Sequence, residues 1–118
     1  MKEEVNSKIL RTLPREKAFY FFTSIGNYTG ESATSLKEFM EKINQVNVKS
    51  LEFHLYRGDF KKWVAEVLQD MELAEQLGKL QETSLSEDLL RNQLYAMVSK
   101  RYRELADQPS SLSKKASI

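Results

Sequence analysis

The sequence predicts a mainly α-helical (α+β) domain, a compact bundle of about five or six short helices with a short aromatic strand or hairpin near residues 18–30. Apolar residues recur at helical spacing over most of the chain. An aromatic run followed by two glycines interrupts that pattern at residues 18–30. The length of 118 residues fits one domain with a single modest core.

The composition is typical of a globular domain, with 41% hydrophobic and 30% charged residues. The absence of cysteine excludes disulfides, thiolate zinc sites and cysteine nucleophiles. The longest apolar run, AFYFF, is too short to span a bilayer. The N-terminal stretch MKEEVNSKIL lacks the basic and then apolar pattern of a signal peptide. We therefore expect a cytoplasmic protein without membrane association.

The first elements are a helix and a hairpin. Apolar residues at helical spacing predict a helix over residues 3–13, which Pro14 cannot continue. The stretch KAFYFFTS then predicts a strand that is buried on both faces. The glycines of IGNYTGES predict a turn, with a return strand through Tyr28 and Thr29.

Two capping boxes predict the starts of two further helices. Ser35 and Glu38 open a helix whose apolar face ends at Ile43. Ser84 and Glu87 open a long helix that we expect to end at Pro109.

Residues 47–56 fit both a helical and an alternating strand pattern, and we interpret them as a helix because their neighbours are helical. The following tripeptide Arg57-Gly58-Asp59 is an adhesion signal in exported proteins. Here we interpret it as a joint, in which Gly58 ends one helix in a left-handed conformation and Asp59 caps the next. Phe60 and Trp63 then anchor that next helix in the core.

The last part of the chain contains a further helix and a tail. Asp70 is placed to cap a helix that runs to about residue 80. The serine-rich end QPSSLSKKASI lacks periodicity. We therefore predict one globular domain over residues 1–107, best specified over 18–80, with a flexible tail over 108–118.

His54 is the only histidine, and its neighbourhood is the one candidate for a pocket. A ligand-binding or enzymatic site there would use His54, Asp59 and Trp63. A metal site needs three or four ligands, and a catalytic site needs partners that the sequence does not supply. We therefore favour a structural histidine and expect no catalytic residues, no metal and no cofactor.

Charge is unevenly distributed along the chain. Residues 66–88 carry seven carboxylates and one lysine, whereas residues 91–118 carry six basic and two acidic side chains. The basic part suggests an RNA-contacting or ribosome-contacting surface in which cations meet phosphates. Complementing the helix dipole would place the same charges, and we favour that interpretation. The residues concerned are Lys100, Arg101, Tyr102, Arg103, Lys114 and Lys115.

A set of motifs over residues 18–80 resembles a small uncharacterised domain family found in archaea and bacteria, a domain of unknown function. The shared motifs are Thr29-Gly30, Ser35-Leu36 with Phe39, Ser50-Leu51 with Phe53-His54, Asp59-Phe60 with Trp63, and Asp70 with Leu73-Ala74. The resemblance implies no reaction, but it includes the aromatic-His pair. Gln69 departs from the pattern, because similar sequences often have glycine before the aspartate.

Three functions follow as hypotheses. The first is a non-catalytic protein-interaction or regulatory module, favoured because a well-specified fold lacks a catalytic set. The second is an RNA-associated or ribosome-associated factor that uses the basic helix and tail. The third is a ligand-binding or enzymatic site centred on His54. The partner is therefore expected to be another protein or a ribonucleoprotein.

Overall fold

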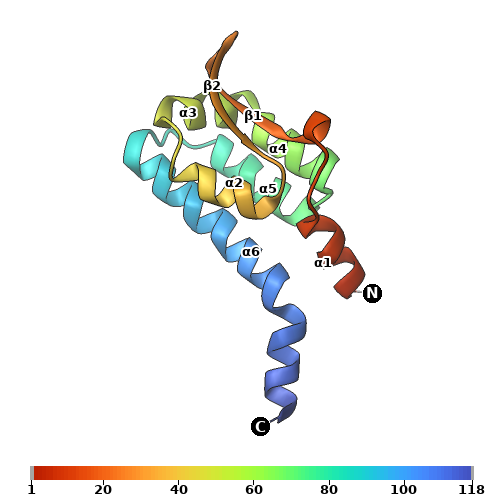
Figure 1. Cartoon of the computed structure of the whole chain (residues 1–118). Coiled ribbons are helices and arrows are strands. Elements are labelled where there is room, and N and C mark those ends of the chain that lie inside the picture. Colours follow the sequence, from red (N-terminus) through yellow and green to blue (C-terminus); the bar gives the residue numbers. More distant parts are fainter. Residues whose placement is uncertain (1, 118) are drawn as a thin grey trace.

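The structure is a computed structural model that describes the backbone of residues 2–117 and the side chains of residues 4–106. Within that range the chain forms six α-helices and one antiparallel hairpin, which confirms the mainly α fold (Figure 1). The helices are α1 (Lys2–Leu10), α2 (Leu36–Ile43), α3 (Val48–Arg57), α4 (Asp59–Trp63), α5 (Met71–Gln81) and α6 (Glu87–Ser117). The strands are β1 (Phe19–Ser24) and β2 (Asn27–Ala33), and a 3-10 turn spans Arg15–Lys17.

Helix α6 lies along one side of the molecule, and the hairpin lies on the opposite side (Figure 1). α6 packs against α1, α2, α3 and α5. Strand β1 packs on α3, and strand β2 packs on α2. Helices α2 and α3 therefore lie between the hairpin and α6.

The core is centred on an aromatic cluster at the junction of the hairpin with α2 and α4. Phe21, Phe39 and Phe60 are fully buried. The ring centroids of Phe39 and Phe60 lie 5.1 Å apart in an edge-to-face arrangement, which is a favourable geometry for aromatic pairs. The Trp63 ring lies 5.4 Å from that of Phe39, and its Nε1 donates to the Lys17 carbonyl oxygen at 2.9 Å. Phe60 and Trp63 therefore anchor α4 in the core, as the sequence predicts.

The aromatic strand is buried on one face only, so the prediction of burial on both faces is wrong. Phe19 and Phe21 are buried, Tyr20 is exposed and Phe22 is half-buried. A two-stranded antiparallel sheet packs one face on the helices and leaves the other to solvent.

The cap of α2 confirms one half of the predicted capping box. The Ser35 Oγ accepts from the Glu38 N–H at 3.1 Å. Glu38 bonds one residue earlier than predicted, because its Oε1 accepts from the Thr34 N–H at 2.7 Å. That backbone bond lowers the pKa of Glu38.

Residues 48–57 are helical, and the predicted joint between two helices is confirmed. Gly58 has a φ of 83° and ends α3, with its N–H donating to the Leu55 carbonyl oxygen at 3.0 Å. The predicted capping role of Asp59 is wrong. Asp59 is the first residue of α4, and its carboxylate accepts from His54 instead of from the backbone of that helix.

A π-helical turn, Val64–Leu68, follows α4 and ends in a left-handed residue, Gln69, with a φ of 66°. The next residue, Asp70, caps α5 as predicted, because its Oδ1 accepts from the Leu73 N–H at 3.3 Å. Gln69 therefore holds a conformation that glycine adopts at lower cost, at the position where it departs from the family pattern.

The two ends of α6 differ from expectation. The Ser84 and Glu87 box is not formed, because the Glu87 N–H donates to Glu52 Oε2 of α3 at 3.1 Å. α6 also extends beyond Pro109, where we expected it to end. The flexible tail predicted over residues 108–118 lies outside the residues whose side chains are described, and it stays a prediction.

Across the described part of the chain, no helix combines the length and apolar character required to cross a membrane.

Candidate functional site

His54 connects the hairpin to the joint between α3 and α4. Its Nε2 lies 2.8 Å from the Phe22 backbone nitrogen, and its Nδ1 lies 2.8 Å from Asp59 Oδ2. A backbone N–H can only donate, so Nε2 accepts from Phe22, and the protonated Nδ1 donates to the Asp59 carboxylate. Both ring nitrogens are therefore bonded, and the side chain is almost fully buried, with the residue 4% exposed.

Burial lowers the pKa of His54 and outweighs the opposite effect of its hydrogen bond to Asp59. The imidazole is therefore neutral near pH 7. A general base or metal ligand needs an available nitrogen lone pair, and Nε2 already accepts from Phe22. In this arrangement both ring nitrogens connect the hairpin to the joint, and a structural role for His54 stays the interpretation that we favour.

The left-handed turn at Gly58 brings Asp59 back beside His54 and next to Arg57. Asp59 Oδ2 lies 3.4 Å from Arg57 Nε. The Arg57 guanidinium carbon lies 4.7 Å from the centre of the Phe53 ring, and the two residues are four apart on α3. A row of contacts therefore runs from the Phe22 backbone through His54 and Asp59 to Arg57.

An open pocket of about 450 Å³ lies beside this row, between α3 and the hairpin. We call it the hairpin pocket. Its wall includes several aromatic rings together with the Arg57 cation and the Asp59 carboxylate. It is lined by Phe19, Tyr20, Phe22, Ser24, Ile25, Gly26, Phe53, His54, Arg57 and Asp59. Such a site can receive an apolar group together with a polar or charged one.

The structure brings together two of the three predicted pocket residues. His54 and Asp59 are bonded to each other and line the hairpin pocket. Trp63 does not line it, because its indole is buried among the core rings.

Sequence reasoning missed Phe22, Ile25, Phe53 and Arg57. Two signals were available: Phe53 and Arg57 share a face of the predicted helix, and Phe22 alternates with the buried Phe21.

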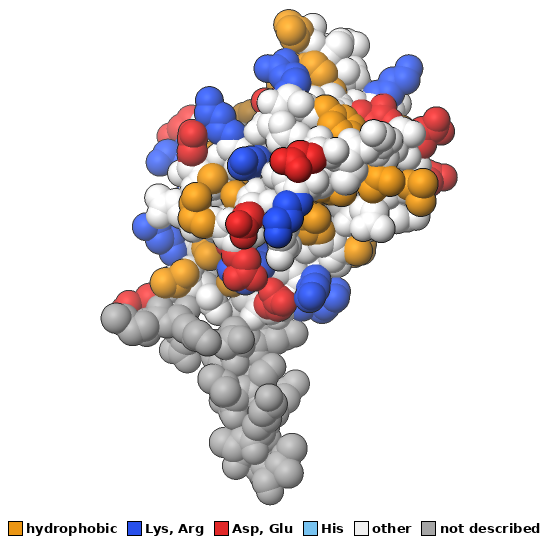
Figure 2. Space-filling view, turned by 180° about the vertical axis from the view of Figure 1, so that it is seen from behind, with side chains coloured by type: hydrophobic (Ala, Val, Ile, Leu, Met, Phe, Trp, Pro, Cys, Tyr) orange, Lys and Arg blue, Asp and Glu red, His pale blue; other side chains and the backbone are white. Residues whose placement is uncertain are grey.

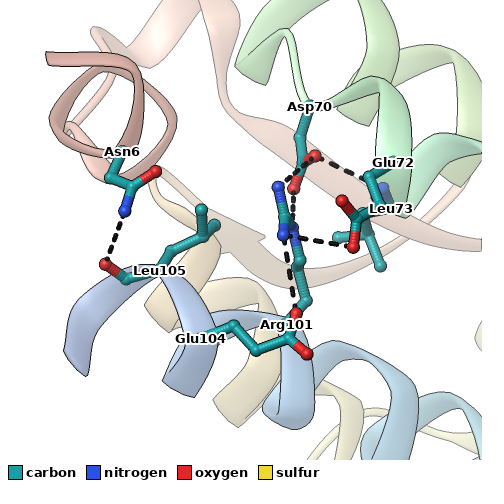
Figure 3. Close-up of polar contacts among 7 residues, drawn as sticks. All are labelled: Asn6, Asp70, Glu72, Leu73, Arg101, Glu104 and Leu105. Carbon is teal, nitrogen blue, oxygen red and sulfur yellow. Dashed lines mark hydrogen bonds and ion pairs between the residues drawn. The ribbon is translucent and has the colours of Figure 1, made fainter. Parts of the chain in front are cut away.

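The basic surface predicted on the last helix is interrupted by an internal ion pair. Arg101 Nε and Nη2 donate to the two carboxylate oxygens of Asp70 at 2.8 and 3.0 Å (Figure 3). Arg101 Nη1 also lies 3.3 Å from Glu72 Oε2 and 3.5 Å from Glu104 Oε1. Arg101 is therefore committed to contacts between α6 and the start of α5.

The other predicted interaction residues are placed differently. Lys100 and Arg103 are exposed, and Tyr102 is half-buried against the core. Lys114 and Lys115 lie outside the residues whose side chains are described. On the face seen in Figure 2, acidic and basic side chains are interspersed with hydrophobic ones.

Among the residues that the structure describes, no group of three or more His, Asp or Glu side chains could hold a metal ion.

The family model described as "Family of unknown function (DUF5752)" matches residues 14–116. The chain belongs to this family. The match confirms the resemblance to an uncharacterised domain family that the motifs of residues 18–80 indicate. Comparisons with curated proteins and with solved structures found no match. Because the family model carries no function, we argue the function of this DUF5752 domain from the geometry of the hairpin pocket and of the His54 contacts.

Proposed function

We propose that this DUF5752 domain is a non-catalytic protein-interaction module that binds its partner at the hairpin pocket. One observation carries the proposal: both ring nitrogens of His54 are hydrogen-bonded within the protein, and the residue lies beside an open aromatic pocket. A proton-transfer site leaves its base free to reach the substrate, whereas here both nitrogens hold the pocket wall in place. These contacts favour a pocket of fixed shape, which suits binding more than proton transfer.

Exposed apolar side chains continue the pocket over the hairpin. Ile25 in the turn is 85% exposed, and Tyr20 and Tyr28 are exposed on the solvent face of the two strands. The Tyr20 hydroxyl donates to the Arg15 carbonyl oxygen at 2.6 Å, which fixes its ring. Exposed aromatic residues with restricted side chains are common at protein interfaces.

The two alternatives have less support. An RNA-associated function would use the basic part of α6, but Arg101 is engaged by three carboxylates. Lys100 and Arg103 stay exposed, so salt-sensitive RNA binding that falls when both are neutralised would favour that alternative. An enzymatic site at His54 would need one of its two hydrogen bonds to break before the ring could act.

The proposal is tested by affinity capture from a lysate of the source organism with three forms of the full chain. Ile25→Glu places a charge in the hairpin pocket at a highly exposed position, so the fold should be retained. Leu89→Glu is the matched control, because Leu89 is also an exposed apolar residue but lies at the start of α6. We expect the wild type and Leu89→Glu to retain the same protein and Ile25→Glu to lose it.

Equal capture by all three forms would place the interaction elsewhere. Capture of nothing by the wild type would contradict the interaction function itself.

A further inference from the structure

We propose that the hairpin pocket receives the C-terminus of its protein partner, with the terminal carboxylate on Arg57 and the last, apolar side chain in the aromatic wall. This inference rests on the proposed function and names the chemistry of the partner. Three features carry it: the free end of the Arg57 guanidinium, the apolar lining, and the Phe53 ring, which contacts the guanidinium and also lines the pocket.

Arg57 is held at its side and open at its end. Its Nε faces the Asp59 carboxylate at 3.4 Å, and its planar group stacks over Phe53. Within the described part of the chain, its two terminal nitrogens have no hydrogen-bond partner. The side chain is 50% exposed. A guanidinium whose orientation is fixed while its fork is free is prepared for two parallel bonds to a carboxylate.

The Asp59 carboxylate does not bind the two terminal nitrogens of Arg57. Asp59 Oδ2 already accepts from His54 and faces Arg57 Nε, so Asp59 is committed to the side of the guanidinium. The contacts of His54 with Phe22 and Asp59 keep Asp59 in that position. His54 is therefore a positioning residue, which acts on Arg57 through Asp59.

The apolar lining of the pocket adjoins the Arg57 guanidinium at Phe53. Phe53 supports the guanidinium and also lines the pocket, so a ligand that contacts both needs its anionic group close to its apolar group. The volume of about 450 Å³ lies in the lower part of the range for ligand pockets. The last residue of a protein meets this requirement, since its carboxylate and its side chain leave the same α-carbon. Recognition of a terminal carboxylate together with the last side chain is a known mode of peptide binding.

The test is a titration of the ¹⁵N-labelled full chain, followed by amide chemical shifts, with three acetylated tetrapeptides. The first is acetyl-Gly-Ser-Gly-Phe with a free carboxylate, the second is its C-terminal amide, and the third replaces Phe by Gly. We expect the first to shift the amides of Phe22, Ile25, Gly26 and Phe53. Amidation and loss of the aromatic side chain should each weaken binding at least about tenfold, since each removes one of the two contacts.

Matched variants assign the carboxylate contact. Arg57→Gln should also weaken the first peptide at least about tenfold, and Arg57→Lys should weaken it less because a point charge is kept. Arg103→Gln is the control, because Arg103 is an exposed arginine on α6. It should bind like the wild type.

Several outcomes overturn the inference. Equal affinity for the acid and the amide would exclude a carboxylate contact, and an unchanged Arg57→Gln would exclude this arginine. Absence of binding by the free-acid peptide, with binding of 3-phenylpropanoate at the same amides, would indicate a small acid as the occupant. Loss of this inference leaves the proposed function intact if Ile25→Glu still abolishes capture of the partner.

Discussion

Gly58 shows how one residue decides the path of the chain. Its φ of 83° turns α3 into α4 and returns Asp59 to His54. Replacement by Ala puts a side chain in a left-handed conformation, and the new Cβ would lie 3.5 Å from the Gln81 side chain, which is an ordinary contact. The cost therefore comes from the backbone, and we expect Gly58→Ala to lower the free energy of unfolding by about 1 kcal/mol.

Chemical denaturation measures this loss, and Gly26→Ala is a comparison at another positive φ, in the exposed hairpin turn. A neutral Gly58→Ala would contradict the account of the joint.

The residues that the sequence predicts well are those whose role depends on near neighbours. Ser35 as a cap, Gly58 as a joint and Asp70 as a cap each follow from a local pattern. The sequence does not predict that Asp59 bonds His54 in place of the backbone, because a carboxylate beside a helix start serves either purpose. Only the tertiary arrangement distinguishes the two.

His54 should make the stability of the fold depend on pH. Its pKa in the folded state lies below the ordinary value of 6.5, because burial disfavours the charged ring. Between those two values the unfolded chain binds more protons than the folded one. The contribution of His54 is therefore complete above about pH 7 and declines as the pH falls through 6.5 towards the folded pKa.

Denaturant unfolding between pH 5 and 8 measures this slope. His54→Gln removes the titrating group and should flatten the profile in that window, even if the variant is less stable throughout. Parallel profiles for the two proteins would show that His54 is not the origin of the effect.

At the scale of elements, α5 and α6 are joined by the pair of Asp70 and Arg101. Asp70 is 2% exposed, and its carboxylate accepts from the Leu73 N–H in the first turn of α5 as well as from Arg101. Removing the cation leaves a buried charge without its partner, which typically costs 3–5 kcal/mol. We therefore expect Arg101→Met to lower the free energy of unfolding by about 3 kcal/mol.

Arg103→Met is the control, since Arg103 is exposed two residues away, and it should change stability by less than about 0.5 kcal/mol. The double variant Asp70→Asn/Arg101→Met should recover part of the loss, because no buried charge is left unpaired. Equal effects of Arg101→Met and Arg103→Met would contradict the buried pair.

Periodicity predicted the existence and type of most of the helices, because the segments are amphipathic. Residues 47–56 fitted both a helical and a strand pattern, and only their helical neighbours favoured the helix that the structure shows. Periodicity could not predict that side chains of the acidic segment and of the basic segment form ion pairs with each other. The acidic segment around Asp70 and the basic segment around Arg101 face each other across two helices, so part of the charge difference along the sequence is cancelled inside the fold. The hairpin pocket was equally invisible, since it forms between a strand and a helix that are about 30 residues apart.

At the scale of the whole molecule, the domain boundary predicted at residue 107 can be tested directly. Leu105 is the last residue of the described core, and its carbonyl oxygen accepts from the Asn6 side chain at 3.2 Å. A chain that ends at residue 107 keeps the packing of Leu105 in the core and its hydrogen bond with Asn6. We expect its free energy of unfolding to lie within about 1 kcal/mol of that of the full chain, because changes outside the core typically have small effects.

Thermal unfolding and denaturant titration of the two chains measure the difference. A truncated chain that fails to fold, or loses several kcal/mol, would move the boundary of the domain into the last part of α6.

The bond between the Phe22 N–H and His54 has a further consequence for self-association. A strand at the border of a sheet exposes donors that another chain can use to extend the sheet, and natural proteins block such borders. In this domain an imidazole occupies one of those donors on β1. Loss of His54 would thus leave the Phe22 N–H unpaired at the edge of an aromatic strand, where another copy of the chain can pair and aggregate.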